Sequence, residues 1–160
     1  MPRKPKPGPL HAPPGYGIST DIAKSSGTWD AVRGQLATAR NYWLATARPD
    51  GRPHTMPVWG LWLDEAFVFA TDAASRKARN LVANPHTSVH LESGDEVVIL
   101  EGVMEQVAEL STLERFVDAY EAKYAIRPDV SESPVYKLRI TVAMTWREKD
   151  YPTSATRWAF

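Results

Sequence analysis

The sequence predicts a mainly β fold, a small closed barrel of six or seven antiparallel strands with three helices between them. Three observations support this prediction. Short segments of alternating apolar and polar residues recur along the 160-residue chain, as is typical of strands. Tight turn sequences separate most consecutive segments, which makes the neighbouring strands antiparallel. The strands and helices do not alternate regularly, as they would in a parallel sheet.

The chain is expected to open with an extended arm over residues 1–17, followed by a single domain over 18–160. The arm is basic and rich in proline, a composition that is typical of segments without a packed core. A helix is expected over 28–40, where apolar residues recur every three or four positions, with Thr28 as its N-cap. A second helix is expected over 109–124, which has the clearest helical periodicity of the chain.

Two strands are expected at 42–48 and 53–63, on either side of the turn sequence Pro49-Asp50-Gly51-Arg52. Pro53 and Pro57 have no N–H group to donate to a neighbouring strand. The second strand is therefore expected to lie at a sheet edge or to contain a bulge. The other strands are expected at 66–70, 86–92, 97–108 and 135–147, with a short additional strand after residue 151.

A third helix is expected over 75–83, and it begins with Ser75, Arg76 and Lys77. A helix start has unpaired N–H groups and a partial positive charge, so it favours acidic side chains and binds anions. Two cations at this end cost an isolated helix some stability, which a bound phosphate would offset through charged hydrogen bonds. The residue types alone leave two interpretations open, an anion site and a solvent-exposed helix end.

Composition restricts the class of partner. Positive and negative side chains balance, with 19 of each, so no overall charge attracts nucleic acid or a membrane surface. The chain has no cysteine, which excludes disulfides and thiolate chemistry and fits a cytoplasmic location. It also has no apolar run near the roughly 18 residues of a membrane-spanning helix. Neither nucleic acid nor a membrane is therefore an expected partner.

The segment "DGRPHTMPVWGLW", followed by "FVFATDAASRKARNLVANP", resembles the flavin-binding split β-barrel proteins of the pyridoxamine 5′-phosphate oxidase-like family. The resemblance covers about residues 36–107. It implies a six-stranded antiparallel split barrel that works as a homodimer, with a cofactor at each interface site. The cofactor-binding residues that it implies are Thr55, Met56, Pro57, Val58 and Trp59 along the ring, Thr71 near the ring or ribityl chain, and Ser75, Arg76 and Lys77 at the phosphate.

The chain also departs from that family's oxidase. The oxidase has basic residues where this chain has Thr55 and Gly60, and it has C-terminal arginine and histidine residues that the ending "SATRWAF" does not match. These differences argue against pyridoxamine phosphate oxidase activity itself. The segments "NYWLAT" and "TRWAF", together with those above, resemble the branch that uses the deazaflavin coenzyme F-420.

That branch implies hydride transfer from reduced F-420 to a small organic acceptor. An FMN-binding oxidoreductase and a non-catalytic F-420 carrier stay open as alternatives, and no catalytic residue is assigned. The carboxylates of the oligoglutamate tail of F-420 would need a track of basic residues. The alternative for the arm is that it is a solvated tail whose cations bind no cofactor. The candidate cations are Arg3, Lys4, Lys6, Arg48, Arg52 and Arg79.

Other polar and aromatic candidates are weaker. His54 is either a proton donor near the ring or a solvent-facing turn residue, and a metal site at His86 and His90 is not expected because strand spacing holds them apart. An acidic hairpin cluster is expected to be solvated. Tryptophans that either wall a pocket or pack in a core or interface are Trp59, Trp62, Trp146 and Trp158.

Overall fold

The computed structural model describes residues 4–11, 13–17 and 27–160. Within them, nine strands and three α-helices form one sheet with peripheral helices. The strands are β1 Lys6–Pro9, β2 Asn41–Ala47, β3 Pro53–Trp59, β4 Leu61–Leu63, β5 Ala66–Ala70, β6 His86–His90, β7 Glu96–Gln106, β8 Val135–Arg147 and β9 Thr156–Ala159. The helices are α1 Trp29–Thr38, α2 Arg76–Ala83 and α3 Leu110–Tyr124, with short 3-10 helices at Pro14–Tyr16 and Glu148–Asp150.

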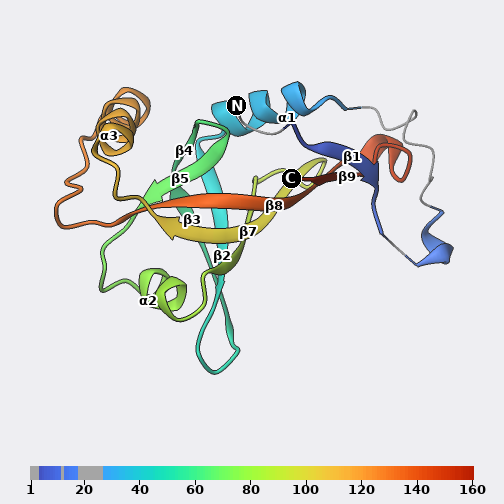
Figure 1. Ribbon diagram of the computed structural model, residues 1–160. Coiled ribbons are helices and arrows are strands. Elements are labelled where there is room, and N and C mark those ends of the chain that lie inside the picture. The colour runs from blue at the N-terminus through green and yellow to red at the C-terminus, as the bar shows by residue number, and fades with distance from the viewer. Residues whose placement is uncertain (1–3, 12, 18–26) are drawn as a thin grey trace.

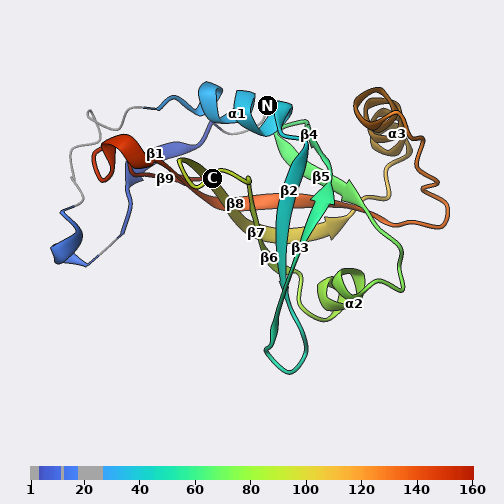
Figure 2. The same cartoon turned by 180° about the vertical axis from the view of Figure 1, so that it is seen from behind.

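All strand pairs are antiparallel, which confirms the predicted mainly β fold with dispersed helices. The sheet runs in the order β1-β9-β8-β7-β6-β2-β3, and β5 joins β8 to β4. The long strand β8 organises this arrangement, because it pairs with β5 near its start, with β7 along most of its length and with β9 towards its end. Figures 1 and 2 show the strands curling around a core, with α1 and α3 above them and α2 below.

One predicted strand is divided in two. The prediction of a single strand over 53–63 is wrong, because the strand is interrupted at Gly60. The residues after it, in β4, pair with β5 instead of continuing along β2. A side chain at Gly60 would place its Cβ 2.5 Å from the Phe67 ring and 2.9 Å from the Val68 carbonyl oxygen. The prediction that this region lies at a sheet edge is confirmed, since β3 ends the strand order.

Local turn chemistry agrees with the sequence. The hairpin between β2 and β3 turns at Gly51, whose φ of 82° suits glycine. The turn between β4 and β5 uses Asp64 and Glu65, with φ of 51° and 61°, the left-handed pair of a two-residue hairpin. Thr28 caps α1 as predicted, because its side chain accepts a hydrogen bond from the Ala31 N–H at 3.3 Å.

The main core lies between the curled sheet and α1. Its largest fully buried side chains include Tyr42, Phe67 and Phe69. The Phe67 ring packs against the other two, with ring centroids 4.8 Å from Tyr42 and 5.6 Å from Phe69. Trp158 is 3% exposed and belongs to this core, with Trp62 packed against it. For these two tryptophans the core interpretation is therefore confirmed.

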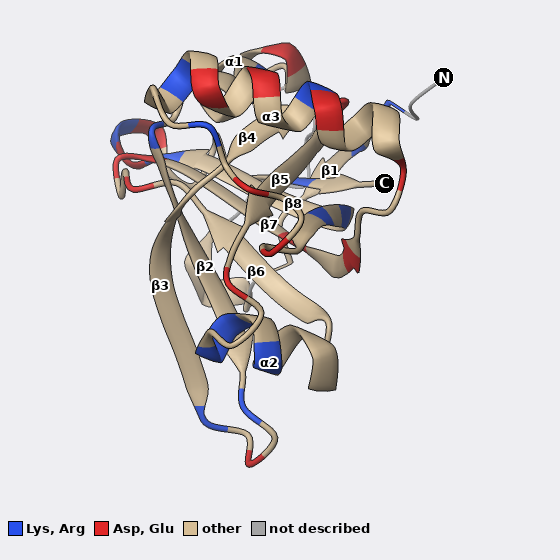
Figure 3. Ribbon diagram, turned by 90° about the vertical axis from the view of Figure 1, so that its left-hand side faces the viewer, with Lys and Arg blue, Asp and Glu red and all other residues tan. Residues whose placement is uncertain are grey.

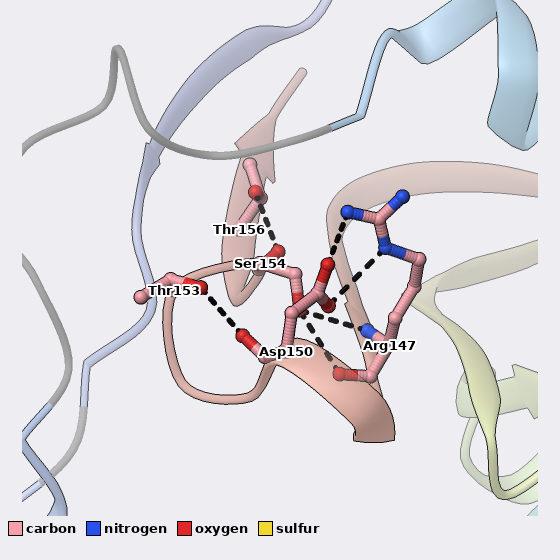
Figure 4. A network of polar contacts seen from close by, with 5 residues as sticks. All are labelled: Arg147, Asp150, Thr153, Ser154 and Thr156. Atoms are coloured by element: carbon pink, nitrogen blue, oxygen red, sulfur yellow. Dashed lines mark hydrogen bonds and ion pairs between the residues drawn. The ribbon is translucent and has the colours of Figure 1, made fainter.

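The C-terminal residues complete the sheet. The expected short strand is present as β9, and part of the arm pairs with it as β1, with Lys6 opposite Ala159. Figure 4 shows the polar network that holds the turn between β8 and β9, in which the Arg147 N–H donates to the Ser154 hydroxyl at 2.9 Å and the Arg147 side chain pairs with Asp150. The predicted arm boundary at residues 17 and 18, and Arg3, lie at or beyond the limit of the described residues.

Candidate functional site

The start of α2 is built by a serine cap. Ser75 has extended backbone angles, and its hydroxyl oxygen accepts a hydrogen bond from the Ala78 N–H at 3.2 Å. The helix therefore begins at Arg76, one residue later than expected, and its first turn holds no acidic residue. The N–H groups of Arg76 and Lys77 lie in the first turn, where the carbonyls four residues earlier are outside the helix, so the helix itself cannot satisfy them.

Thr71 and Ser75, two of the predicted site residues, are brought together. Their hydroxyl oxygens lie 3.2 Å apart, and the Thr71 N–H donates to the Pro134 carbonyl at 3.3 Å. The loop between them is closed by the Ser75 N–H, which donates to the Asp72 carbonyl at 3.0 Å. Thr71, at the end of β5, thus fixes the orientation of the hydroxyl at the helix start.

The two cations of this helix start have no counter-charge in the described part of the chain. Arg76 is exposed and Lys77 half-buried, and neither forms an ion pair or a side-chain hydrogen bond with a described residue. Figure 3 shows the basic residues of α2 beside the strands of the β2–β3 hairpin, whose tip carries further basic residues. The helix dipole and both side chains therefore add positive charge at the start of α2.

A buried amide anchors α2 to the sheet. Asn80 is 0% exposed, and its Nδ2 donates to the Thr46 hydroxyl at 2.9 Å. The Thr46 hydroxyl in turn donates to the His54 carbonyl at 3.4 Å, so α2, β2 and β3 are joined by one chain of hydrogen bonds. Sequence reasoning missed Asn80; its only signal is a polar residue between Ala78 and Leu81 on the inward side of the helix.

His54 lies beside this anchor and is half-buried, which corrects its interpretation as a solvent-facing turn residue. It is the direct cross-strand partner of Thr46, so both side chains project from the same face of the sheet. Its Nδ1 atom is buried and has no hydrogen-bond partner among the described residues. Burial lowers the pKa of the imidazole, and the positive charges of Arg48, Lys77 and Arg76 lower it further.

The five predicted ring-binding residues of β3 divide into two groups. Thr55, Met56 and Pro57 are exposed, and Met56 retains 43% of its surface. Val58 is buried, and Trp59 stacks on Tyr124 of α3 with ring centroids 4.7 Å apart. Because β3 ends the sheet, the backbone edge at residues 55–57 is the part that a flat ligand can approach.

The far end of β3 carries a second cationic group that sequence reasoning missed. The Lys123 ammonium donates to the Gly60 carbonyl at 3.0 Å and lies 5.1 Å from the Tyr42 ring centroid. Burial, and then the nearby Arg40 charge, lowers the pKa of Lys123 to about 8. These contacts join residues more than sixty positions apart, so no local sequence pattern predicts them.

The remaining candidates are not assembled into a site. His90 stacks on Trp43 with centroids 6.2 Å apart, and no group of three or more His, Asp or Glu side chains in the described ranges is placed to hold a metal. Arg52 is paired with Asp50 at 2.7 Å. Figures 1 and 2 place β1, with Lys6, away from the β2–β3 hairpin, so the arm and hairpin cations of the predicted basic track do not adjoin.

The other candidate residues lie at the periphery. Trp146 makes an edge contact with Tyr151, with centroids 6.2 Å apart. A hydrogen bond with Asp95, in the turn between β6 and β7, raises the pKa of Glu148, which lies in the 3-10 helix after β8. None of the described helices combines the length and apolar character required to cross a membrane.

Comparisons with known proteins identify relatives of the chain. The family model for pyridoxamine 5′-phosphate oxidase matches residues 28–147. A pyridoxine/pyridoxamine 5′-phosphate oxidase of Acidothermus cellulolyticus is 31% identical over 137 residues, covering 81% of this chain and 57% of that protein. The chain spans between 30% and 60% of the length of the curated relatives that it matches.

Solved structures show the same fold. The conserved hypothetical protein Rv2991 from Mycobacterium tuberculosis superposes with a TM-score of 0.69 at 26% identity, covering 78% of this chain and 88% of that one. An F420 reductase shares the fold with a TM-score of 0.58 at 23% identity, covering 69% of this chain and 94% of that one. The antiparallel barrel, the capped α2 and the matched residues lead to one conclusion: the chain belongs to the pyridoxamine 5′-phosphate oxidase family.

Proposed function

We propose that this protein is an oxidoreductase that binds coenzyme F-420 beside β3 and α2 and uses it to reduce a small organic acceptor. The observation that carries the proposal is the uncompensated positive charge of Arg76 and Lys77 at the serine-capped start of α2, next to the exposed edge of β3. Family membership supports a flavin-related oxidoreductase, and the sequence segments around both elements favour the deazaflavin.

The donor set fits a phosphate. Ser75 offers a hydroxyl, Arg76 a planar guanidinium and Lys77 an ammonium, and the first N–H groups of α2 add further donors at the helix start. In this proposal Thr71 orients the Ser75 hydroxyl, while Asn80 and Thr46 hold the helix at a fixed height above the hairpin. The phosphate group would lie against α2, as a charged anchor for the rest of the cofactor.

The ring would lie along Thr55, Met56 and Pro57, whose side chains are exposed and whose outer backbone edge pairs with no strand of the described residues. When bound, reduced F-420 supplies a hydride. The chain's own contribution is to bind the ring, to orient it and to exclude water from one face. Trp59 would close the far end of this edge, because its stacking on Tyr124 holds it in place.

We also propose that a second copy of the chain covers the cofactor. Met56 on β3 and Val82 on α2, the two elements of the proposed site, are large apolar residues with 43% and 82% of their surface exposed. A homodimer would bury them and complete the water-excluded site. Sedimentation or light scattering of the purified protein tests this, and a monomer at micromolar concentration would contradict it.

The deciding experiment is a side-by-side fluorescence titration of the purified protein with F-420 and with FMN. The proposal expects micromolar or tighter binding of F-420. Comparable or tighter binding of FMN would transfer the assignment to an FMN-dependent oxidoreductase, and binding of neither cofactor would exclude both.

Turnover separates an enzyme from a carrier. Reduced F-420 is offered with a panel of enones and quinones, and loss of its absorbance is followed with and without protein. Oxidation that depends on protein and acceptor supports the reductase. Tight binding without turnover of any acceptor favours a protein that stores or transfers the cofactor.

A further inference from the structure

His54, near the start of α2, carries an imidazole, a group that can change its charge close to neutral pH. It lies on the sheet face that Asn80 anchors to α2, directly opposite Thr46. The charged groups that act on it are Arg48, at the end of β2, and Lys77 and Arg76, on α2. No carboxylate among the described residues offsets them at the imidazole.

Two observations suggest that this cluster is incomplete in the free protein. The His54 Nδ1 and the Arg48 Nε are both buried, and neither has a hydrogen-bond partner among the described residues. Buried polar atoms are normally satisfied, and an unsatisfied one costs free energy. The positive charges of Arg48, Lys77 and Arg76 disfavour a further positive charge on the imidazole.

We propose that His54 is a proton-accepting member of the phosphate site: binding of a dianion at Ser75, Arg76 and Lys77 draws a proton from solvent onto the imidazole. Burial, and then the positive charges of Arg48, Lys77 and Arg76, lower the pKa of the imidazole and so favour its neutral form. A dianion reverses the local potential and favours the imidazolium, whose N–H groups then donate. Affinity for a dianion therefore falls as pH rises through the range in which the free imidazole is neutral and the bound one is protonated.

The inference rests on the proposed phosphate site and adds that this site prefers a doubly charged anion to a singly charged one. A phosphate monoester, as in FMN, carries close to two negative charges at neutral pH, whereas a phosphodiester, as in F-420, carries one. The dianion would protonate His54 more completely. Anions that do not titrate themselves between pH 5 and 8 separate these effects, and sulfate with methyl sulfate forms such a matched pair.

The test is proton NMR of the four histidine rings of the full chain from pH 5 to 8, with sulfate, with methyl sulfate and without either. The His54→Gln variant assigns the His54 signal. We expect sulfate to raise the proton affinity of His54 at least about threefold, or half a pKa unit, with a smaller effect of methyl sulfate. At each pH, sulfate should leave the signals of His11, His86 and His90 unchanged.

Two controls separate this inference from the proposed function. Sulfate affinity should fall with pH in the wild-type protein and stay constant in His54→Gln, and Arg76→Ala should weaken binding in both backgrounds. Sulfate binding that depends on Arg76 but leaves the His54 titration unchanged would overturn this inference alone. Failure of sulfate to bind in an Arg76-dependent way would overturn it together with the phosphate site.

Discussion

The Lys123 ammonium donates a hydrogen bond to the Gly60 carbonyl, with Nζ and O 3.0 Å apart, at the point where β3 gives way to β4. The same carbonyl also lies 2.8 Å from the Tyr124 hydroxyl, whose oxygen accepts from the Gly60 N–H at 3.0 Å. The last turn of α3 thus satisfies both backbone groups of the residue that interrupts the edge strand. The break is a supported feature of the fold, and it sets where the exposed edge ends.

Lys123 gives the protein a defined dependence of stability on pH. Its pKa in the folded state is lowered to about 8, because burial and the nearby Arg40 charge disfavour the ammonium. Above pH 8 the unfolded chain therefore holds more protons at this residue than the folded chain, and the free energy of unfolding rises with pH. Below pH 8 both states are charged and the cost of burying the ammonium is present in full.

Urea denaturation between pH 7.5 and 9.5 checks this prediction. This pH range lies below the ordinary pKa of tyrosine, so tyrosines do not contribute to the change. We expect the rise between pH 8 and 9.5 in the wild-type protein and in Lys149→Met, which changes an exposed lysine. Lys123→Met should lack it. An equal rise in Lys123→Met would show that another group is responsible.

Gly60→Ala should destabilise the fold by about 1–3 kcal/mol, the usual cost of overpacking. The added Cβ would lie 2.5 Å from the Phe67 ring and 2.9 Å from the Val68 carbonyl oxygen. Gly34→Ala is the matched control, because that glycine is in α1 with nothing within 4 Å of an added Cβ. It should be stabilising by about 0.5–1 kcal/mol. A Gly60→Ala protein as stable as the wild type in urea would contradict the expectation that Phe67 and Val68 leave no room for a side chain at this position.

The hydrogen bond between Asn80 and Thr46 should contribute measurably to stability. Asn80→Ala removes a buried amide and leaves the Thr46 hydroxyl without its donor, which should cost about 1–3 kcal/mol. Thr46→Val removes the other partner. The double variant should be more stable than the sum of the two single effects predicts, with a coupling of about 0.5–3 kcal/mol. Strict additivity in urea denaturation would mean that the contact carries no net energy.

Arg76→Ala and Lys77→Ala should each weaken binding of the proposed cofactor by about 1.5–3 kcal/mol, the scale of a charged hydrogen bond. Fluorescence titration measures the change. Arg139→Ala is the control, since this arginine is on β8 and paired with Glu105 at 2.6 Å. Unchanged affinity in both α2 variants would show that the phosphate binds elsewhere.

Local patterns were sufficient for most elements of this fold. Alternation located the strands to within a few residues, and the turn sequence around Gly51 located the β2–β3 hairpin. The start of α2 was located to within one residue, since Ser75, expected as the first helical residue, is the N-cap and the two cations follow it. These features depend on residues close in sequence, and short-range sterics and hydrogen bonds act in any context.

The candidate site was predictable only in part. Arg76, Lys77 and Ser75 could be named from the sign of the charge at a helix start, and Thr55 to Trp59 from the family resemblance. Asn80, His54 and Lys123 gain their roles from neighbours that sequence spacing does not reveal. Asn80 is bonded to a residue 34 positions away, and Lys123 to one 63 positions away.

By itself, then, the sequence determined the antiparallel strands, the capped helix starts and the excess positive charge at α2. Only the tertiary structure decided that the edge strand ends at Gly60, that an amide anchors α2, and which histidine and lysine have lowered pKa values. The physical reason is that close packing and desolvation depend on every element around a residue. Strand period, turn geometry and helix capping depend on a few residues of local chain.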